Sequence, residues 1–254
     1  MPIEPVILTP PEISCLRRSC SLAREALHSV ARPLVRAGVT TEAIDDAVRA
    51  FVLASGAYPS PLNFDGFPKS VSTSVNDVAG HGIPDDRPLE PGDVVNVDVT
   101  VYLDGFHGDT SATFVVPGGD PEAAEWAARL VSAARECLYA GVAACGPDEP
   151  FLRIGHAISK LSKRRHVRVV PQLCGHGIGR HFHAVPDIYH TLNYSPGAMK
   201  PGMAFTIEPC VSEGLPKIRQ LEDGWTWVTV DGSRTAQFEH TVLVTPYGVD
   251  VLTM

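Results

Sequence analysis

The spacing of hydrophobic residues predicts two helices at the start of the chain. Apolar side chains recur at alternating steps of three and four across residues 13–34, which places them on one face of a helix. After Gly38, residues Ile44, Val48 and Val52 repeat this spacing within residues 41–52. Glycine, proline and asparagine then accumulate between residues 56 and 68. We therefore predict two helices followed by a long loop, a kind of segment that often carries functional residues.

A strict alternation of valine and polar residues predicts a β-hairpin over residues 93–116. The valines at positions 95–101 face one side of the first strand, and the other side presents Asn96, Asp98 and Thr100. The dipeptide Asp104-Gly105 is typical of a two-residue hairpin turn. If these two residues form the turn, Leu103 pairs with Phe106, and Asp98 pairs with Ser111.

The order of elements then repeats. Helices are predicted over residues 120–138 and 148–161, and a closing strand over residues 236–244. His81-Gly82-Ile83 recurs as His176-Gly177-Ile178. Each Pro-Gly pair, at 91 and at 201, is followed by an acid at the seventh residue after its proline, Asp98 or Glu208. We predict two related halves that face each other across a pseudo-twofold axis. Both would lie in a single domain over residues 1–254, with a short N-terminal extension of residues 1–10.

Composition and charge narrow the classes of function. The 254 residues are 44% hydrophobic and 20% charged, which is typical of a globular protein. With 21 basic and 29 acidic residues, the net charge of −8 argues against a nucleic-acid-binding or anionic-membrane-binding surface. Residues 160–168 are basic, and we interpret them as a solvated helix end, so no nucleic-acid-binding motif is assigned. No apolar run is long enough to span a membrane.

The cysteines and the first residues indicate a cytoplasmic protein. The six cysteines are scattered without a Cys-x-x-Cys pair, so neither a disulfide framework nor a zinc ribbon is expected. The first residues have no basic region followed by an apolar one, which a secretory signal requires.

The predicted hairpin brings two aspartates together. Asp109 lies two residues from Ser111, the predicted partner of Asp98, so both carboxylates project from the same face about 7–8 Å apart. Two carboxylates at this separation can bind one divalent cation, or they can be solvated side chains on an exposed sheet. The hairpin alone leaves these two interpretations evenly balanced.

The internal repeat adds three potential metal ligands. Pseudo-twofold symmetry places Glu208 opposite Asp98, His176 is the second copy of His81, and Glu239 interrupts the closing apolar strand. Four carboxylates in one place repel by about 4 kcal/mol per pair at ~4 Å and an effective dielectric constant near 20. No lysine or arginine occurs in these motifs, whereas two divalent cations would balance the charge. We therefore predict a two-metal site of the Mn, Fe, Co or Zn type.

Six segments resemble those of type I methionine aminopeptidases, and the resemblance extends from about residue 13 to residue 252. It implies an α+β "pita-bread" fold, in which two pseudo-twofold-related halves form an antiparallel sheet core covered by helices. This fold agrees with the repeat found above. The six segments are residues 74–85, 96–100, 104–111, 174–179, 206–209 and 237–241.

The resemblance implies a role for each predicted ligand. Asp98 would bind the first metal, His176 and Glu208 the second, and Asp109 and Glu239 would bridge both. The metals would be two divalent ions, with Co, Mn, Fe, Zn and Ni as candidates. A hydroxide between them would attack the scissile carbonyl, and Glu208 would shuttle the proton.

The resemblance also separates catalytic histidines from the others. His81 would contact the scissile amide or the leaving nitrogen, and His183 would contact the carbonyl oxygen as charge develops. We interpret His107, His181 and His240 as structural or supporting residues. The remaining histidines are interpreted as surface or core residues: His28, His156, His166 and His190.

By resemblance, the methionine side chain would bind against Phe64, Phe67, Ser72, His81, Phe182, Cys210, Trp225 and Gln237. Phenylalanines stand at 64 and 67 where the family usually has tyrosines, Ser72 replaces a frequent cysteine, and Cys210 replaces a frequent methionine. These differences keep the pocket apolar and change its fine preference. A monovalent-cation site of the family is matched by Asn76, Val78 and Thr235.

The implied activity is removal of the initiator methionine from nascent proteins whose second residue is small, by a monomer that associates transiently with the ribosome. A proline-directed aminopeptidase or dipeptidase of the same fold is the alternative, although such relatives usually carry a large N-terminal domain. A metal-free binding module is a further alternative, but such proteins lose metal ligands, and all five are present here.

Overall fold

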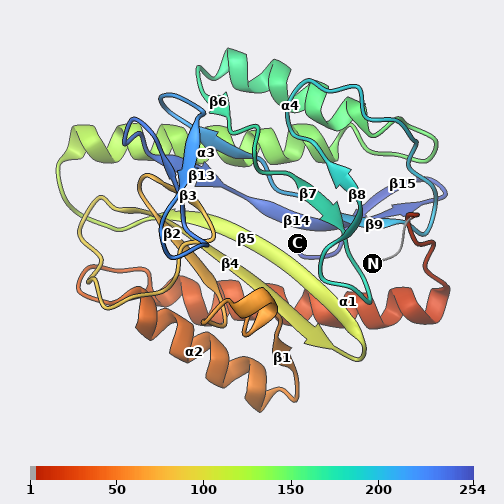
Figure 1. Ribbon diagram of the computed structural model, residues 1–254, viewed down its shortest axis with the longest axis horizontal. Coiled ribbons are helices and arrows are strands. Elements are labelled where there is room, and N and C mark those ends of the chain that lie inside the picture. Colours follow the sequence, from red (N-terminus) through yellow and green to blue (C-terminus); the bar gives the residue numbers. More distant parts are fainter. Residues whose placement is uncertain (1–3) are drawn as a thin grey trace.

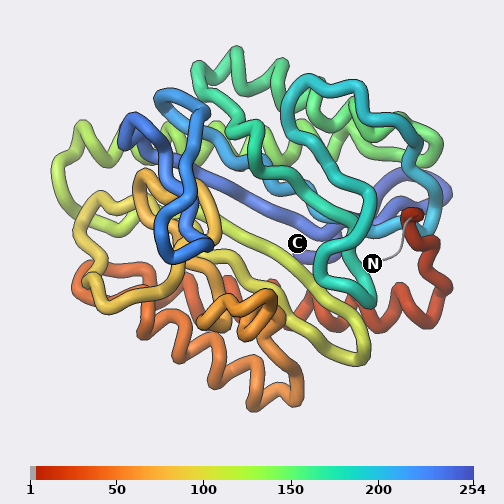
Figure 2. The backbone as a smooth tube through the Cα atoms, viewed as in Figure 1, coloured from red at the N-terminus to blue at the C-terminus, as the bar shows by residue number. Residues whose placement is uncertain are grey.

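The computed structural model describes residues 4–254, so the first three residues of the predicted extension 1–10 lie outside the described part. Two pairs of helices flank a curved sheet (Figures 1 and 2). On one side lie α1 (Pro10–Glu25) and α2 (Thr41–Ala54). Helix α1 continues through a π-helical segment (Ala26–Ala31) and a 3-10 turn (Arg32–Leu34). On the other side lie α3 (Pro121–Val142) and α4 (Leu152–Arg164). Within residues 4–254, no helix combines the length and apolar character needed to cross a bilayer.

Polar capping residues explain where three of the helices begin. At α1, the Glu12 carboxylate accepts the backbone N–H of Thr9 at 2.9 Å in a capping box. At α2, Thr40 Oγ1 accepts the N–H of Ala43 at 3.1 Å. At α3, the Asp120 carboxylate caps the helix, and Pro121 is its first residue. These predicted helices are confirmed.

The start of the fourth helix was predicted too early, at residue 148. The structure begins α4 at Leu152, and Asp148 has a positive φ of 64° that no helix residue adopts. The N–H of Asp148 donates to the carbonyl of Met199, and the N–H of Met199 donates to the carbonyl of Glu149, at 2.8 and 2.9 Å. Pairing with a segment about 50 residues away therefore overrides the local preference for helix.

In the described part of the chain the main sheet has nine strands, and all its pairings are antiparallel. Its main path runs β1 (Tyr58–Pro59), β4 (Val94–Leu103), β5 (Phe106–Val115), β14 (Glu239–Thr245), β9 (Ala204–Ile207), β7 (Gly175–Gly177), β8 (Ala184–Ile188). Two further strands join at the side, β2 (Ser72–Val75) on β4 and β15 (Gly248–Val251) on β14. One small sheet contains β13 (Thr235–Gln237), β10 (Cys210–Ser212) and β6 (Arg168–Val169), and another contains β11 (Ile218–Gln220), β12 (Trp227–Thr229) and β3 (Val78–Gly80).

The β4–β5 hairpin has the predicted register. Leu103 pairs with Phe106, and Asp98 pairs with Ser111. Asp104 and Gly105 form the turn with φ angles of 52° and 84°, the positive values that a type I′ turn requires.

The predicted closing strand over residues 236–244 is two strands instead of one. The chain breaks at Phe238, because β13 pairs with β10 in a small sheet while β14 pairs with β5 and β9 in the large one. The Phe238 side chain packs against both of the large hydrophobic clusters, which keeps the break between the two sheets.

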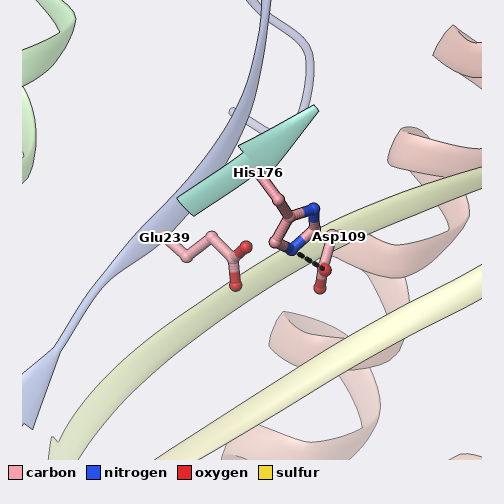
Figure 3. A group of neighbouring side chains, drawn as sticks. All are labelled: Asp109, His176 and Glu239. Atoms are coloured by element: carbon pink, nitrogen blue, oxygen red, sulfur yellow. Dashed lines mark ion pairs between the residues drawn. The ribbon is translucent and has the colours of Figure 1, made fainter. Parts of the chain in front are cut away.

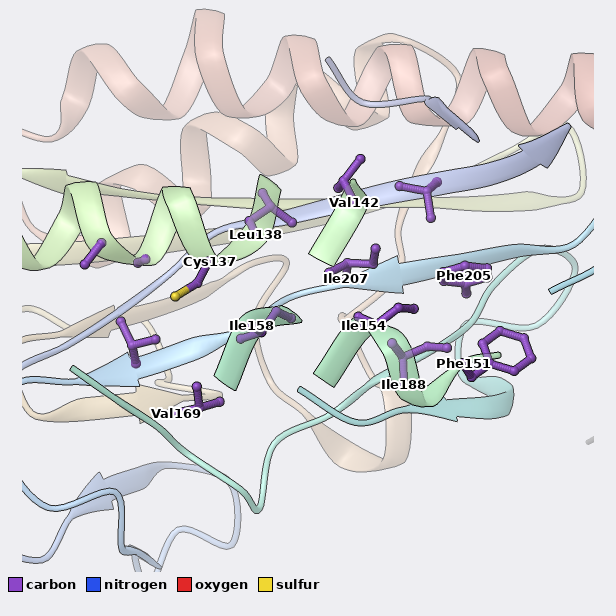
Figure 4. Close-up of a cluster of buried hydrophobic side chains, with 14 of the residues drawn as sticks. Cys137, Leu138, Val142, Phe151, Ile154, Ile158, Val169, Ile188, Phe205 and Ile207 are labelled. Carbon is purple, nitrogen blue, oxygen red and sulfur yellow. The ribbon is translucent and has the colours of Figure 1, made fainter. Parts of the chain in front are cut away.

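Each half of the molecule has its own hydrophobic core. In the first half, Leu27, Ile44 and Val48 of the helices pack on the valines of β4. In the second half, α3 and α4 pack on β9 and β14 through residues such as Ile158 and Ile207 (Figure 4). The valine face of β4 is thus buried against helices, and its polar face is directed to the other side of the sheet, as the alternation predicts.

Candidate metal centre and substrate pocket

Four strands and the residue that follows a fifth bring the predicted metal ligands into one pocket. The register places Asp98 on β4 opposite Ser111 on β5, and Ser111 opposite Glu239 on β14. Asp109 lies two residues further along β5 on the same face. Glu208 directly follows β9, and His176 is the middle residue of β7. All five of these side chains line the same pocket.

The distances between the side chains suit a metal ion. Single donor atoms of Asp109, His176 and Glu239 lie within 4.8 Å of one another, and the three side chains point toward one another in Figure 3. His176 Nε2 lies 3.8 Å from Asp109 Oδ2 and 3.6 Å from Glu208 Oε1. Both distances are longer than a hydrogen bond. A cation between these atoms would instead be coordinated by them.

The chemistry of this donor set also fits divalent cations. Burial raises the pKa of Asp98 to about 7, a rise that a hydrogen bond with Asp109 limits, and it raises the pKa of Glu208 to about 8. Burial and the neighbouring carboxylates raise the pKa values of Asp109 and Glu239 well above their usual range. Within residues 4–254, no lysine or arginine lines the pocket. These carboxylates are therefore neutralised either by protons or by metal cations from solution.

The histidines of the pocket are neutral at physiological pH. Burial lowers the pKa of His176 to about 3 and that of His183 to about 4, and it also lowers the pKa of His81. His176 Nδ1 lies 3.2 Å from the carbonyl of Gly177, an arrangement in which Nδ1 donates and Nε2 stays free for a metal.

Two threonines and a glutamine orient the carboxylates. Thr100 Oγ1 donates to Asp109 Oδ1 at 2.7 Å, and Thr206 Oγ1 donates to Glu208 Oε1 at 2.8 Å. Gln237 Nε2 donates to Glu208 Oε2 at 3.2 Å. From the sequence, Gln237 was predicted only as a substrate contact, and neither threonine was predicted. Their positions were the available signal, because Thr206 lies two residues before Glu208 and Thr100 is the residue that pairs with Asp109 in the register of the hairpin.

Aromatic side chains form the apolar part of the pocket, whose volume is about 330 Å³. Phe64 packs edge-on against Phe182 with ring centres 5.0 Å apart, and Phe67 packs in the same way against Trp225 at 5.2 Å. His183 stacks on Phe182 at 4.1 Å. Also lining the pocket are the predicted residues His81, Ser72 and Gln237.

Cys210 is the one predicted pocket residue that the structure places elsewhere. It is buried behind the pocket with Ala79, Val170 and Ile218, and its Sγ donates to the carbonyl of Ala79 at 3.3 Å. It follows Glu208 by two residues, but Pro209 separates them and β10 turns into a different small sheet. The following pocket residues were also not predicted from the sequence: Pro61, Ser74, Gly80, Asn96, Gln172, Leu173, Cys174 and Asp187.

The residues of the predicted monovalent-cation site also meet. Thr235 Oγ1 donates to the carbonyl of Val78 at 2.9 Å and to that of Asn76 at 3.3 Å, so three oxygen atoms lie close together. Asn76 has a positive φ of 56°, and its carbonyl also accepts the backbone N–H of Thr235 at 2.8 Å.

Two histidines that were not assigned to the site contact residues that line it. His107 stacks on Phe182 with ring centres 5.5 Å apart, and its Nδ1 lies 2.9 Å from Ser60 Oγ. His190, interpreted from the sequence as a surface or core residue, is buried, and its Nε2 accepts the backbone N–H of Glu208 at 3.1 Å.

Comparisons with known proteins agree with this geometry. The sequence profile of metallopeptidase family M24 matches residues 14–246. "Methionine aminopeptidase 1D, mitochondrial" of Mus musculus is 49% identical over 242 residues, which are 95% of this chain and 71% of the relative. The crystal structure of methionine aminopeptidase from Rickettsia prowazekii superposes with a TM-score of 0.93 at 38% identity, over 99% of this chain and 100% of that one. The prolidase from Pyrococcus furiosus has a TM-score of 0.72 at 20% identity, over 98% of this chain and 65% of that one, which shows the fold alone.

The fold and the pocket thus define a metallopeptidase of the pita-bread type. The chain belongs to metallopeptidase family M24. The resemblance to methionine aminopeptidases and the fold predicted from it are confirmed.

Proposed function

We propose that this protein hydrolyses the N-terminal, initiator methionine from nascent polypeptides whose second residue is small. The observation that carries the proposal is the joining of two features in one pocket: a cluster of four carboxylates and an imidazole, and beside it an apolar surface of four aromatic rings. The identity of 49% with a methionine aminopeptidase supports this substrate over the proline-directed alternative, for which only the fold is shared.

The proposed metal ligands are Asp98, Asp109, His176, Glu208 and Glu239, which would hold two divalent ions. Co, Mn, Fe, Zn and Ni all accept this mixture of carboxylate and imidazole ligands. When bound, such ions would act as Lewis acids toward the scissile carbonyl and would make a water molecule acidic enough to attack near neutral pH.

The side chains around the ions would perform the remaining steps. Glu208 would accept the proton of the attacking water and transfer it to the leaving nitrogen. His81 would contact the scissile amide, and His183 would stabilise the carbonyl oxygen as charge develops on it. The methionine side chain would bind among the residues that line the apolar part of the pocket, namely Phe64, Phe67, Ser72, Phe182, Trp225 and Gln237.

The remaining features rest on the resemblance. Residues 1–254 would form one catalytic domain that acts as a monomer in the cytoplasm and meets nascent chains during transient association with the ribosome. The oxygens of Asn76, Val78 and Thr235 would hold one monovalent cation.

The test measures methionine release from Met-Ala-Ser beside cleavage of Ala-Pro-Ala, with chelator-stripped protein titrated with Mn or Co. We expect turnover of the methionine peptide alone, rising with metal. Asp109→Ala should lower this turnover more than about 100-fold. Loss of a side chain that only hydrogen-bonds to a metal ligand already costs about 10–100-fold, and loss of the ligand itself costs more. Asp46→Ala, which removes an exposed carboxylate of α2, is the matched control and should retain activity.

Cleavage of Ala-Pro-Ala instead would keep the metal site and overturn the proposed substrate. Tight metal binding without cleavage of either peptide would favour the binding module.

A further inference from the structure

His190 contacts the candidate site through one hydrogen bond. Its side chain is only 2% exposed, and its Nε2 accepts the backbone N–H of Glu208 at 3.1 Å. The strand before Glu208 ends at Ile207, whose pairing with His240 is the last of the β9–β14 ladder at this end. The next residue, Pro209, has no N–H to donate. His190 is therefore the acceptor that holds the main chain where β9 leaves the sheet.

The chemistry of imidazole explains why a histidine occupies this position. A ring nitrogen that accepts a hydrogen bond carries no proton, so the proton of the neutral ring is on Nδ1. An apolar side chain would fill the same space but would offer no acceptor to the N–H of Glu208. The bond from Nε2 to Glu208 is thus what the histidine contributes.

Helix α4 holds the segment that carries His190. A Cβ at Gly155 would lie 2.1 Å from the carbonyl oxygen of Thr191, so this backbone touches α4 at a position that only glycine permits. His156 Nε2 lies 3.2 Å from the carbonyl oxygen of Asn193, and the Asn193 amide donates to the carbonyl of Thr191 at 2.9 Å. The imidazole is therefore presented from a rigid support.

We propose that His190 is a positioning residue: its imidazole fixes the backbone of Glu208 and so sets the direction of the Glu208 carboxylate in the pocket. Thr206 and Gln237 orient the same carboxylate from its other end. The inference rests on the proposed function, in which Glu208 binds a metal and moves the proton. His190 does not line the methionine pocket, so it acts on kcat and on metal binding and leaves KM unchanged.

The test compares two substitutions that differ in hydrogen bonding. His190→Leu fills the space without an acceptor, whereas His190→Gln offers an amide oxygen that can accept the N–H of Glu208. We expect His190→Leu to lower kcat for Met-Ala-Ser about 10–100-fold and to weaken Mn binding in calorimetry by a similar factor, with KM within about twofold. His190→Gln should recover most of both losses. The matched control is His28→Leu, which removes an exposed histidine of the π-helical segment in the first half of the molecule and should retain kcat and Mn affinity.

Circular dichroism and thermal unfolding establish first that each variant is folded. If His190→Leu does not fold, His190→Met replaces it, because a thioether is only a weak acceptor. If neither variant folds, the Mn affinity of His190→Gln decides, and a loss of that affinity overturns the proposal. Kinetics and Mn affinity that stay within about twofold in the folded Leu or Met variant overturn the proposal, and so does an equal loss in His190→Gln. If the parent protein binds Mn without releasing methionine, the proposed function is wrong, and the Mn affinities of the variants still test His190.

Discussion

Hydroxyl groups determine how the buried carboxylates of the pocket are directed. Thr100 and Thr206 each donate to one oxygen of an acid, at 2.7 and 2.8 Å. A hydrogen bond to the ionised form favours that form. On Asp109 the Thr100 hydroxyl occupies Oδ1 and leaves Oδ2 to face a cation. Loss of such a partner of a metal ligand typically lowers metal affinity or activity about 10–100-fold.

The substitution Thr100→Val tests this arrangement. It removes the hydroxyl that holds Asp109 and keeps the shape of the side chain, so we expect Mn affinity and turnover to fall about tenfold. The matched control is Thr73→Val on β2, since the buried Oγ1 of Thr73 has no hydrogen-bond partner within residues 4–254. Its removal should leave Mn affinity unchanged and stability equal or higher. Equal Mn affinities in the two variants, measured by calorimetry, would contradict this assignment.

At the scale of elements, α1 and β5 touch through their backbones. A Cβ at Gly108 would lie 2.4 Å from the backbone nitrogen of Cys20, so the strand that carries Asp109 can approach the helix only at a glycine. This close contact fixes the position of β5 against α1. It therefore also fixes the position of Asp109 in the metal centre.

We therefore expect Gly108→Ala to destabilise the protein by about 1–3 kcal/mol, since the helix backbone must move. Turnover should fall as well, because Asp109 is the next residue. Gly146→Ala is the control, as its Cβ would meet Glu149 Cγ at an ordinary 3.5 Å. Urea unfolding of both variants provides the measurement, and a Gly108→Ala protein as stable as the control would show that α1 and β5 are not in tight contact.

Elements with local signals were predictable, and those defined by distant partners were not. The β4–β5 register followed from the turn pair Asp104-Gly105, which lies within the hairpin itself. The start of α4 and the break at Phe238 depend on contacts with residues around 199 and with two separate sheets. No local pattern contains that information.

At the scale of the whole molecule, the candidate metal centre joins the two halves. Asp98 and Asp109 come from the first half, whereas His176, Glu208 and Glu239 come from the second. Ions bound between them would link the two cores and would bind the folded protein far more tightly than the unfolded chain. Bound metal should therefore raise the melting temperature.

This arrangement makes the stability of the metal-free protein depend on pH. The folded-state pKa values of about 7 for Asp98 and about 8 for Glu208 lie above those of an unfolded chain, which has released these protons by about pH 5. The folded state then binds more protons than the unfolded state, so its stability falls as the pH rises toward these values. The lowered pKa values of His176 and His183 change stability only below about pH 7, in the range of the unfolded imidazole.

We expect the melting temperature of chelator-stripped protein to fall between about pH 7 and pH 8.5, and that of Mn-loaded protein to stay level or rise, because metal binding favours deprotonated ligands. Differential scanning calorimetry at both pH values checks this. A metal-free protein that gains stability over this range would show that the carboxylates are not buried together.

By itself, the sequence determined the helices, the central hairpin, the doubled architecture and the residues that meet at the pocket, because periodicity, turn chemistry and repeated motifs are local properties. Only the tertiary structure decided which side chains hydrogen-bond to those residues and which of the predicted residues line the pocket. Cys210 was predicted to line the pocket and packs behind it, while His190 was interpreted as a surface or core residue and contacts the backbone of Glu208. Burial and hydrogen-bond partners depend on segments that are far apart in the chain and meet only when it folds.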